Sequence, residues 1–109
     1  KKNPEEAAKY FAKAAAQYNI EAQYSYGLCF LNGTGVEKDL NKYAEYMKLS
    51  ADQGNVEAMY RYAECLEKGE GTRKNVQEAI QYYDMAGDKG HQRAREAYLR
   101  LTPPEPTKK

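Results

Sequence analysis

The sequence predicts an all-α protein, a right-handed α-solenoid of about six helices stacked as antiparallel pairs. Three observations support this fold class. The chain matches itself when it is shifted by 36 residues. Apolar residues within each copy recur at the three- and four-residue spacing of an amphipathic helix. Glycines and capping residues stand at matching positions, where helices begin and end. A single helix pair cannot bury its apolar face, so about three stacked pairs are needed for stability.

The repeat accounts for nearly the whole chain of 109 residues. Residues 19–54 align with residues 55–90, and 12 of the 36 aligned positions are identical. The same register continues outward, because residues 3–18 fit the second half of a repeat and residues 91–101 fit the first half of another. We therefore expect one array of two full and two half repeats.

The array is expected to fill residues 1–101 and to be followed by a tail, 102–109. This tail has three prolines in four positions, a composition that favours extended or disordered chain. The helices within the array follow from the apolar spacing and the turn residues. We expect them at about 4–17, 21–32, 40–53, 57–68, 76–89 and 91–101.

Polar residues mark where the helices begin. Asn3 is an expected N-cap, with Pro4 at the first helical position. Asp39 and Asn75 are matching N-caps of the second helices, and Glu78 is placed to complete a capping box with Asn75.

Glycines mark where the helices end. Gly54 and Gly90 stand where a left-handed residue stops a helix, and Tyr18 holds the same position in the first half repeat. The stretch "NGTG" at 32–35 returns as "KGEG" at 68–71. A phosphate-binding loop needs a preceding strand and a longer glycine pattern, so these stretches are interpreted as loops between the two helices of a repeat.

The unit resembles the Sel-one-like repeat (SLR), a relative of the tetratricopeptide repeat. The residues that carry the resemblance are Ala22, Tyr26, Gly27, Phe30, Gly33, Gly35, Val36, Asp39, Ala44, Tyr46, Ala51 and Gly54. The second copy departs from the pattern at Ala63, Thr72 and Asn75. The resemblance extends from residue 3 to about residue 101.

Charge and hydropathy argue against two classes of partner. The chain carries 17 basic and 16 acidic residues, a net charge of +1, which gives no electrostatic case for nucleic acid or an anionic membrane. Its apolar runs are far shorter than the roughly 18 residues that span a bilayer. We therefore expect neither nucleic-acid binding nor membrane insertion.

Cysteine and histidine usage gives no sign of a cofactor. Cys29 and Cys65 occupy the same position of successive repeats and are interpreted as core residues rather than a disulfide. His91 is the sole histidine, so a Cys/His metal site and a catalytic histidine are both disfavoured. We expect no metal, no cofactor, reduced thiols and a cytoplasmic location.

The resemblance implies that the first helix of each pair lines a concave wall that binds other proteins. The residues carried over to that wall are Tyr24, Leu28, Leu31, Tyr60, Glu64, Glu67, Glu96 and Arg100. They form an apolar strip at one end and an acidic strip beside it, with an arginine close by. This predicts a partner with basic residues beside an apolar anchor. The alternative is that Tyr24 and Tyr60 pack against the next repeat.

Three hypotheses for function follow. The first is a non-catalytic scaffold or adaptor that binds a peptide or protein segment. The second is an enzyme of the cell-envelope type, because some bacterial relatives have been linked to binding or hydrolysis of β-lactams. The lack of those relatives' cysteine pattern and of a nucleophile–base pair in this sequence argues against it. The third is a spacer, or a module that associates end to end through the apolar faces of helices 4–17 and 91–101.

Overall fold

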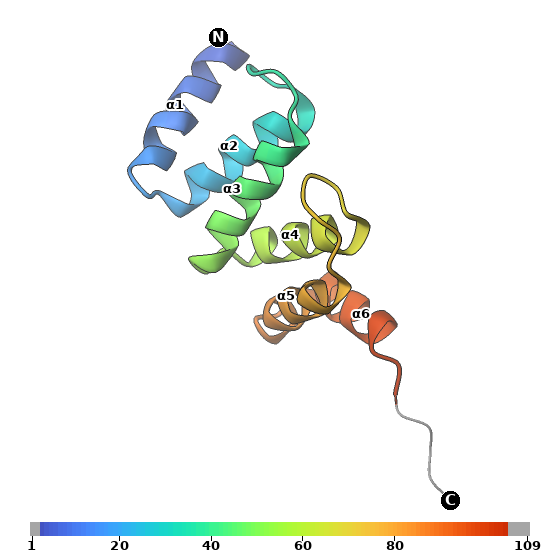
Figure 1. The fold of residues 1–109 in the computed structure, drawn as a ribbon. Coiled ribbons are helices and arrows are strands. Elements are labelled where there is room, and N and C mark those ends of the chain that lie inside the picture. The colour runs from blue at the N-terminus through green and yellow to red at the C-terminus, as the bar shows by residue number, and fades with distance from the viewer. Residues whose placement is uncertain (1–2, 105–109) are drawn as a thin grey trace, which may run out of the picture.

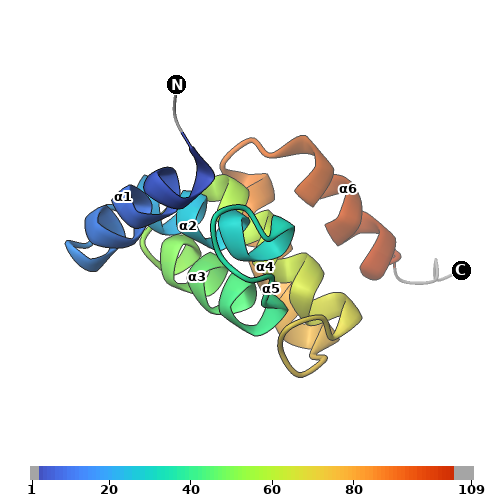
Figure 2. The same ribbon diagram turned by 90° about the horizontal axis from the view of Figure 1, so that it is seen from above.

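In the computed structural model, which describes residues 3–104, six helices follow one another in a single row (Figure 1). Their bounds are α1 (Pro4–Ala16), α2 (Ile20–Asn32), α3 (Leu40–Asp52), α4 (Val56–Lys68), α5 (Val76–Asp88) and α6 (Gln92–Leu101). The extensive packing joins consecutive helices, and α1 and α6 lie at opposite ends of the row in both views (Figure 2). The predicted all-α solenoid is confirmed. Residues 105–109 of the predicted disordered tail lie outside the described part of the chain.

Every helix begins at a side chain that caps it. In each case the cap accepts a hydrogen bond from the backbone N–H three residues later, which satisfies one of the unpaired donors of the first turn. The predicted caps are confirmed, and three further helices begin in the same way. The six caps are Asn3, Asn19, Asp39, Asn55, Asn75 and His91.

The predicted capping box at the start of α5 forms only in part. The Glu78 backbone N–H donates to Asn75 Oδ1 at 3.0 Å, as expected. The Glu78 carboxylate, however, accepts from the Asn75 side-chain amide at 3.3 Å. The Asn75 backbone N–H is already bonded to the Leu66 carbonyl of α4 at 2.8 Å, and this bond ties the loop to the preceding helix.

The glycine loops end the first helices and also contact the preceding unit. Gly33 caps α2 in the left-handed conformation, with φ 70°, as expected of a turn glycine. Gly35 lies so close to α1 that an added Cβ would overlap the Pro4 carbonyl, and Gly71 lies in the same way over the Leu40 carbonyl of α3. Glycine is therefore required there by close approach as well as by its positive φ.

The turns between successive repeats also use positive φ. Gly54 and Gly90 have φ 108° and 98°, and Tyr18 takes φ 66° at the matching turn. Among the described residues, Tyr18 is the one non-glycine residue with positive φ. The turn geometry is therefore retained where the glycine is lost.

The core runs along the row between the helices. Each full repeat contains an edge-to-face pair of tyrosine rings: Tyr26 meets Tyr46, and Tyr62 meets Tyr82, with 5.0 Å between the ring centroids in both. Such pairs add about 0.5–1.5 kcal/mol beyond the burial of their area. The aromatic positions of the sequence repeat therefore join the two helices of one repeat.

Both cysteines are buried and unbonded, which confirms their assignment to the core. Burial raises the pKa of the Cys65 thiol to about 12 and also raises the pKa of Cys29. The thiolate is the reactive form, so folded protein should react slowly with iodoacetamide near pH 8.

We expect Cys65, isolated in a Cys29→Ser variant, to be alkylated at least about tenfold more slowly in folded protein than in concentrated urea. Mass spectrometry of timed samples measures both rates. A synthetic peptide with one cysteine, in the same two buffers, corrects for any effect of urea on the reagent. Equal corrected rates would show that Cys65 is accessible in the folded state.

Candidate partner-binding surface

The eight residues predicted for the wall all lie on α2, α4 and α6, and we call the surface that these three helices form the first-helix face. Two hollows adjoin between α4 and α6. One, of about 480 Å³, is lined by Tyr60, Arg93, Glu96, Ala97 and Arg100. The other, of about 620 Å³, is lined by Glu57, Gly90, His91, Gln92, Arg93 and Glu96. Three predicted residues therefore share one hollow, and Arg93 and Glu96 join it to the next.

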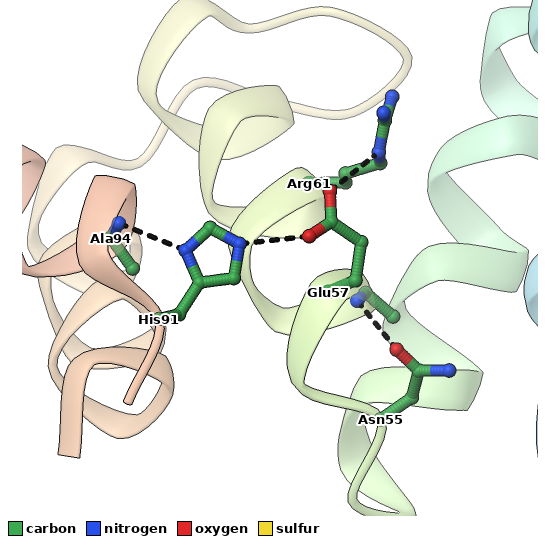
Figure 3. A network of polar contacts seen from close by, with 6 residues as sticks. Asn55, Glu57, Arg61, His91 and Ala94 are labelled. Carbon is green, nitrogen blue, oxygen red and sulfur yellow. Dashed lines mark hydrogen bonds and ion pairs between the residues drawn. The ribbon is translucent and has the colours of Figure 1, made fainter. Parts of the chain in front are cut away.

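A polar network that includes Glu57 and His91, both of which line the larger hollow, joins α6 to α4 (Figure 3). His91 Nδ1 accepts the Ala94 backbone N–H at 3.1 Å, and this is the N-cap of α6. The neutral ring therefore carries its proton on Nε2 and donates it to Glu57 Oε1, 2.8 Å away. The other Glu57 oxygen accepts from Arg61 Nε at 3.2 Å, within the same helix. The contacts of His91 are thus those of a structural residue.

Tyr60 packs against the next repeat and also lines a hollow. Its ring stacks on the His91 ring, with 4.5 Å between centroids and 21° between planes. It also lies 5.8 Å from the Tyr83 ring of α5. Burial raises the pKa of Tyr60, and the Glu64 carboxylate beside it raises the pKa further. Tyr60 is therefore held in one orientation, with part of its surface exposed to the hollow.

The acidic strip is weaker than the sequence predicted, because Glu67 is neutralised. Arg100 binds its carboxylate through two nitrogens, at 2.8 and 3.2 Å. The Tyr83 hydroxyl donates to the same carboxylate at 2.8 Å. Of the three predicted acids, Glu64 and Glu96 make no ion pair within residues 3–104.

The pKa of Glu67 is lowered, chiefly by its hydrogen bond from Arg100, with Tyr83 acting in the same direction and burial opposing both. A carboxylate with a lowered folded-state pKa stabilises the protein above its unfolded pKa, about 4.3, and loses this contribution as the pH falls through its folded pKa. We therefore expect Glu67→Gln to cost about 0.5–1 kcal/mol at pH 7, since Arg100 is mostly exposed.

This difference between wild type and Glu67→Gln should shrink as the pH is lowered from 6 to 3. Urea unfolding at each pH, followed by circular dichroism, measures it. Glu45→Gln, which alters an exposed carboxylate on α3 with no ion pair in the described chain, is the control. A difference that does not change with pH would show that the Glu67–Arg100 pair does not contribute through its charge.

The side chains of the predicted apolar strip at the α2 end are only partly exposed to solvent. Tyr24, Leu28 and Leu31 are each half-buried and pack against the core. Burial raises the pKa of Tyr24, and the neighbouring Arg61 of α4 opposes this rise. The strip therefore continues the core up to the surface.

Sequence reasoning missed several residues of the first-helix face. Glu57, Arg61 and Arg93 were not singled out, although two of them form the network that seats α6 and the third lines both hollows. A signal was present in the chain. Carboxylates of α4 lie beside hydrogen-bond donors 33 or 34 residues later in the chain: Glu57 beside His91, and Glu67 beside Arg100.

Metal ligation and membrane insertion find no support in residues 3–104. They contain no group of three or more His, Cys, Asp or Glu side chains placed to hold a metal ion. None of their helices has the length and apolar content needed to cross a bilayer.

A row of capped helix pairs, with the same loop in each and a hollowed face of first helices, defines an α-solenoid of helix–turn–helix repeats. The model of the Sel1 repeat family matches residues 1–19, 20–55 and 56–91. The chain therefore belongs to the Sel1 repeat family. The two full matched units, 20–55 and 56–91, are each 36 residues long and begin one residue after the repeats found in the sequence.

Solved structures agree with this assignment. A Sel1 repeat protein from Oxalobacter formigenes is 32% identical over 93% of this chain, with a TM-score of 0.90, and the chain spans 42% of its length. Two others share the fold at lower identity. The protective antigen c5321 of uropathogenic Escherichia coli, with an SLR fold, is 22% identical over 89% of this chain and 21% of its own, with a TM-score of 0.84.

The third structure is the cysteine-rich protein B of Helicobacter pylori. It is 23% identical over 83% of this chain and 68% of its own, with a TM-score of 0.78. A comparison with curated proteins finds no significant match. Sel1 repeat proteins are generally helical-repeat scaffolds for protein interaction.

Proposed function

We propose that this chain is a non-catalytic scaffold that binds an extended or helical segment of another protein on the first-helix face. The pair of hollows between α4 and α6 is the observation that carries the proposal. They adjoin, they open on the face that lines the concave wall of such arrays, and Tyr60 lies in one of them.

The chemistry of the hollows supports one class of partner. Tyr60 offers an amphipathic ring held by His91, so little rotamer freedom is lost on binding. Tyrosine and arginine are enriched among the residues that dominate binding energy. Glu64 and Glu96 lie near this ring without an ion pair in the described residues, and both favour a basic partner. The partner segment is therefore an apolar anchor flanked by lysine or arginine.

Arg93 adds a second requirement for the chemistry of the partner segment. It lines both hollows and makes no ion pair within the described range. A carboxylate or a run of backbone carbonyls on the bound segment would satisfy its guanidinium. We therefore place an acidic residue or a turn of the partner beside Arg93, and its basic residues towards Glu64.

The test is affinity capture from the native lysate with wild type and a Glu64→Lys/Glu96→Lys variant, read by mass spectrometry. Both changes are made at half-buried or exposed carboxylates without ion pairs in the described chain, so the fold should persist, and circular dichroism checks this. Glu45→Lys on the exposed side of α3 is the matched control for charge. Proteins retained by wild type and by the control, but lost with the double variant, support the proposal.

A charge-swap experiment then distinguishes direct contact of the partner with Glu64 and Glu96 from an indirect loss of binding in the double variant. A segment of the captured partner with its basic residues changed to glutamate should bind the double variant better than it binds wild type. Equal recovery of every partner by wild type and the double variant would contradict the assignment of the first-helix face.

A further inference from the structure

The N-cap of α6 differs in kind from the caps of the other five helices. The caps of α1 to α5 are the side-chain oxygens of asparagine or aspartate. His91, the sole histidine of the chain, caps α6 through Nδ1, which accepts the Ala94 backbone N–H at 3.1 Å. Histidine is the side-chain type that ordinarily changes charge between about pH 5 and 8. The start of α6 therefore depends on whether its cap carries a proton.

Protonation of the ring removes its contact with α6. In the imidazolium both ring nitrogens carry a hydrogen, so Nδ1 becomes a donor and cannot accept the Ala94 N–H. Two donors then face each other across the 3.1 Å that now separates donor from acceptor. A positive charge is also unfavourable at the N-terminus of a helix, where the helix dipole is positive. The cationic form therefore cannot cap α6.

Protonation strengthens the contacts of the same ring with α4. Nε2 donates to Glu57 Oε1 at 2.8 Å in both forms, and in the cation this hydrogen bond becomes an ion pair (Figure 3). The ring also stacks on Tyr60, with 4.5 Å between centroids, and a cation is attracted to the face of an aromatic ring. The charged ring therefore stays on α4 while the first turn of α6 loses its cap.

Charged side chains reach the surroundings of His91 from three helices. Glu57 is shared between His91 and Arg61, and Arg95 binds both aspartates at the end of α5. Of all these groups, the imidazole is the one whose type ordinarily changes charge between about pH 5 and 8. The full set is Glu57 and Arg61 on α4, Asp84, Asp88 and Lys89 at the end of α5, and Arg93, Arg95 and Glu96 on α6.

We propose that His91 is a pH-sensitive latch, a side chain that holds the first turn of α6 when neutral and releases it when protonated. His91, Gln92 and Arg93 of this turn line the larger hollow, so the shape of the hollow follows the charge of the ring. The consequence for a partner rests on the proposed function. A segment bound beside Arg93 is held more weakly in acid.

Amide NMR spectra of the wild-type chain between about pH 8 and about pH 5 test the latch. The chain contains its own comparison, because three first helices have alanine at the position that donates to the cap. The Ala94 amide proton should move upfield as the histidine takes up its proton, since it loses its hydrogen bond, and the other two should not move. The three pairs are Ala22 with Asn19, Ala58 with Asn55, and Ala94 with His91.

The Arg95 amide separates loss of the cap from the effect of a new charge nearby. It donates to the His91 backbone carbonyl at 3.0 Å, a bond that does not involve the ring. An Ala94 shift no larger than that of Arg95, or no Ala94 shift at all, would overturn the proposal. The comparison is made within wild type, so it does not depend on the folding of a variant.

His91→Asn gives α6 the cap of the other first helices and is the matched variant. Its Ala94 amide should no longer respond to pH. If Ala94 still moves in this variant, another group causes the change and the latch is wrong.

A capture experiment at the same two pH values tests the consequence for binding. Partners retained at about pH 8 should be recovered about fivefold less at about pH 5 with wild type, the effect of losing a typical cap, and equally at both with His91→Asn. Equal recovery with wild type would overturn the effect on binding. Capture of no partner would contradict the proposed function alone, because the amide titration decides the latch without a partner.

Discussion

Replacing Gly71 by alanine is expected to lower the free energy of unfolding by about 2–5 kcal/mol. Gly71 has φ 74°, a conformation that costs other residues about 1–2 kcal/mol. The added Cβ would also overlap the Leu40 carbonyl of α3, so the loop must move away from the helix it contacts. Strain of this kind costs about 1–3 kcal/mol more. Urea unfolding followed by circular dichroism measures the sum.

Gly33→Ala separates the two contributions. Gly33 has nearly the same φ, 70°, but the atom nearest to an added Cβ lies 3.5 Å away. It should therefore lose only the conformational part, about 1–2 kcal/mol. Equal losses at Gly33 and Gly71 would show that the contact with α3 does not matter.

Tyr83→Ala is expected to cost about 3–5 kcal/mol, the range for removing a large buried aromatic side chain. Tyr83 is 1% exposed and lies under Tyr60, so its loss leaves a cavity between α4 and α5. Tyr83→Phe removes just the hydroxyl that donates to Glu67. Since Glu67 keeps its two bonds from Arg100, this second change should cost about 1 kcal/mol.

The same unfolding measurement gives both values. Met85→Ala, at an exposed position of the same helix, should change stability by less than about 0.5 kcal/mol. If Tyr83→Ala costs no more than Met85→Ala, the ring is not part of the core. If Tyr83→Phe costs as much as Tyr83→Ala, the hydrogen bond rather than packing carries the effect.

The helices were predictable from the sequence because their signals are local. The 36-residue repeat gave their number and order, and the caps at Asn3, Asp39 and Asn75 gave three of their starts. The predicted ends differ from the observed ones by no more than one residue in the full repeats. The close approach of Gly35 to Pro4 was not predictable, because it depends on how one repeat rests on another.

The first-helix face was predictable only as a set of positions. The rotation of α6 against α4 decides which of these side chains remain available to a partner. This rotation pairs Arg100 with Glu67. The same rotation places His91 within hydrogen-bond distance of Glu57 and places Arg93 in the lining of the hollows. Such pairings join residues more than 30 positions apart, beyond the reach of local sequence patterns.

The loop glycines have a consequence for how genes of this kind can change in length. Gly35 and Gly71 each rest on the first residue of the second helix one unit earlier. A tandem duplication or deletion of 36 codons therefore preserves every such contact, whichever residue it starts from within the array. A change whose length is not a multiple of 36 codons places a bulkier residue over a carbonyl and misaligns the caps. Whole-unit gain and loss is thus the route by which an array like this one can lengthen without refolding its neighbours.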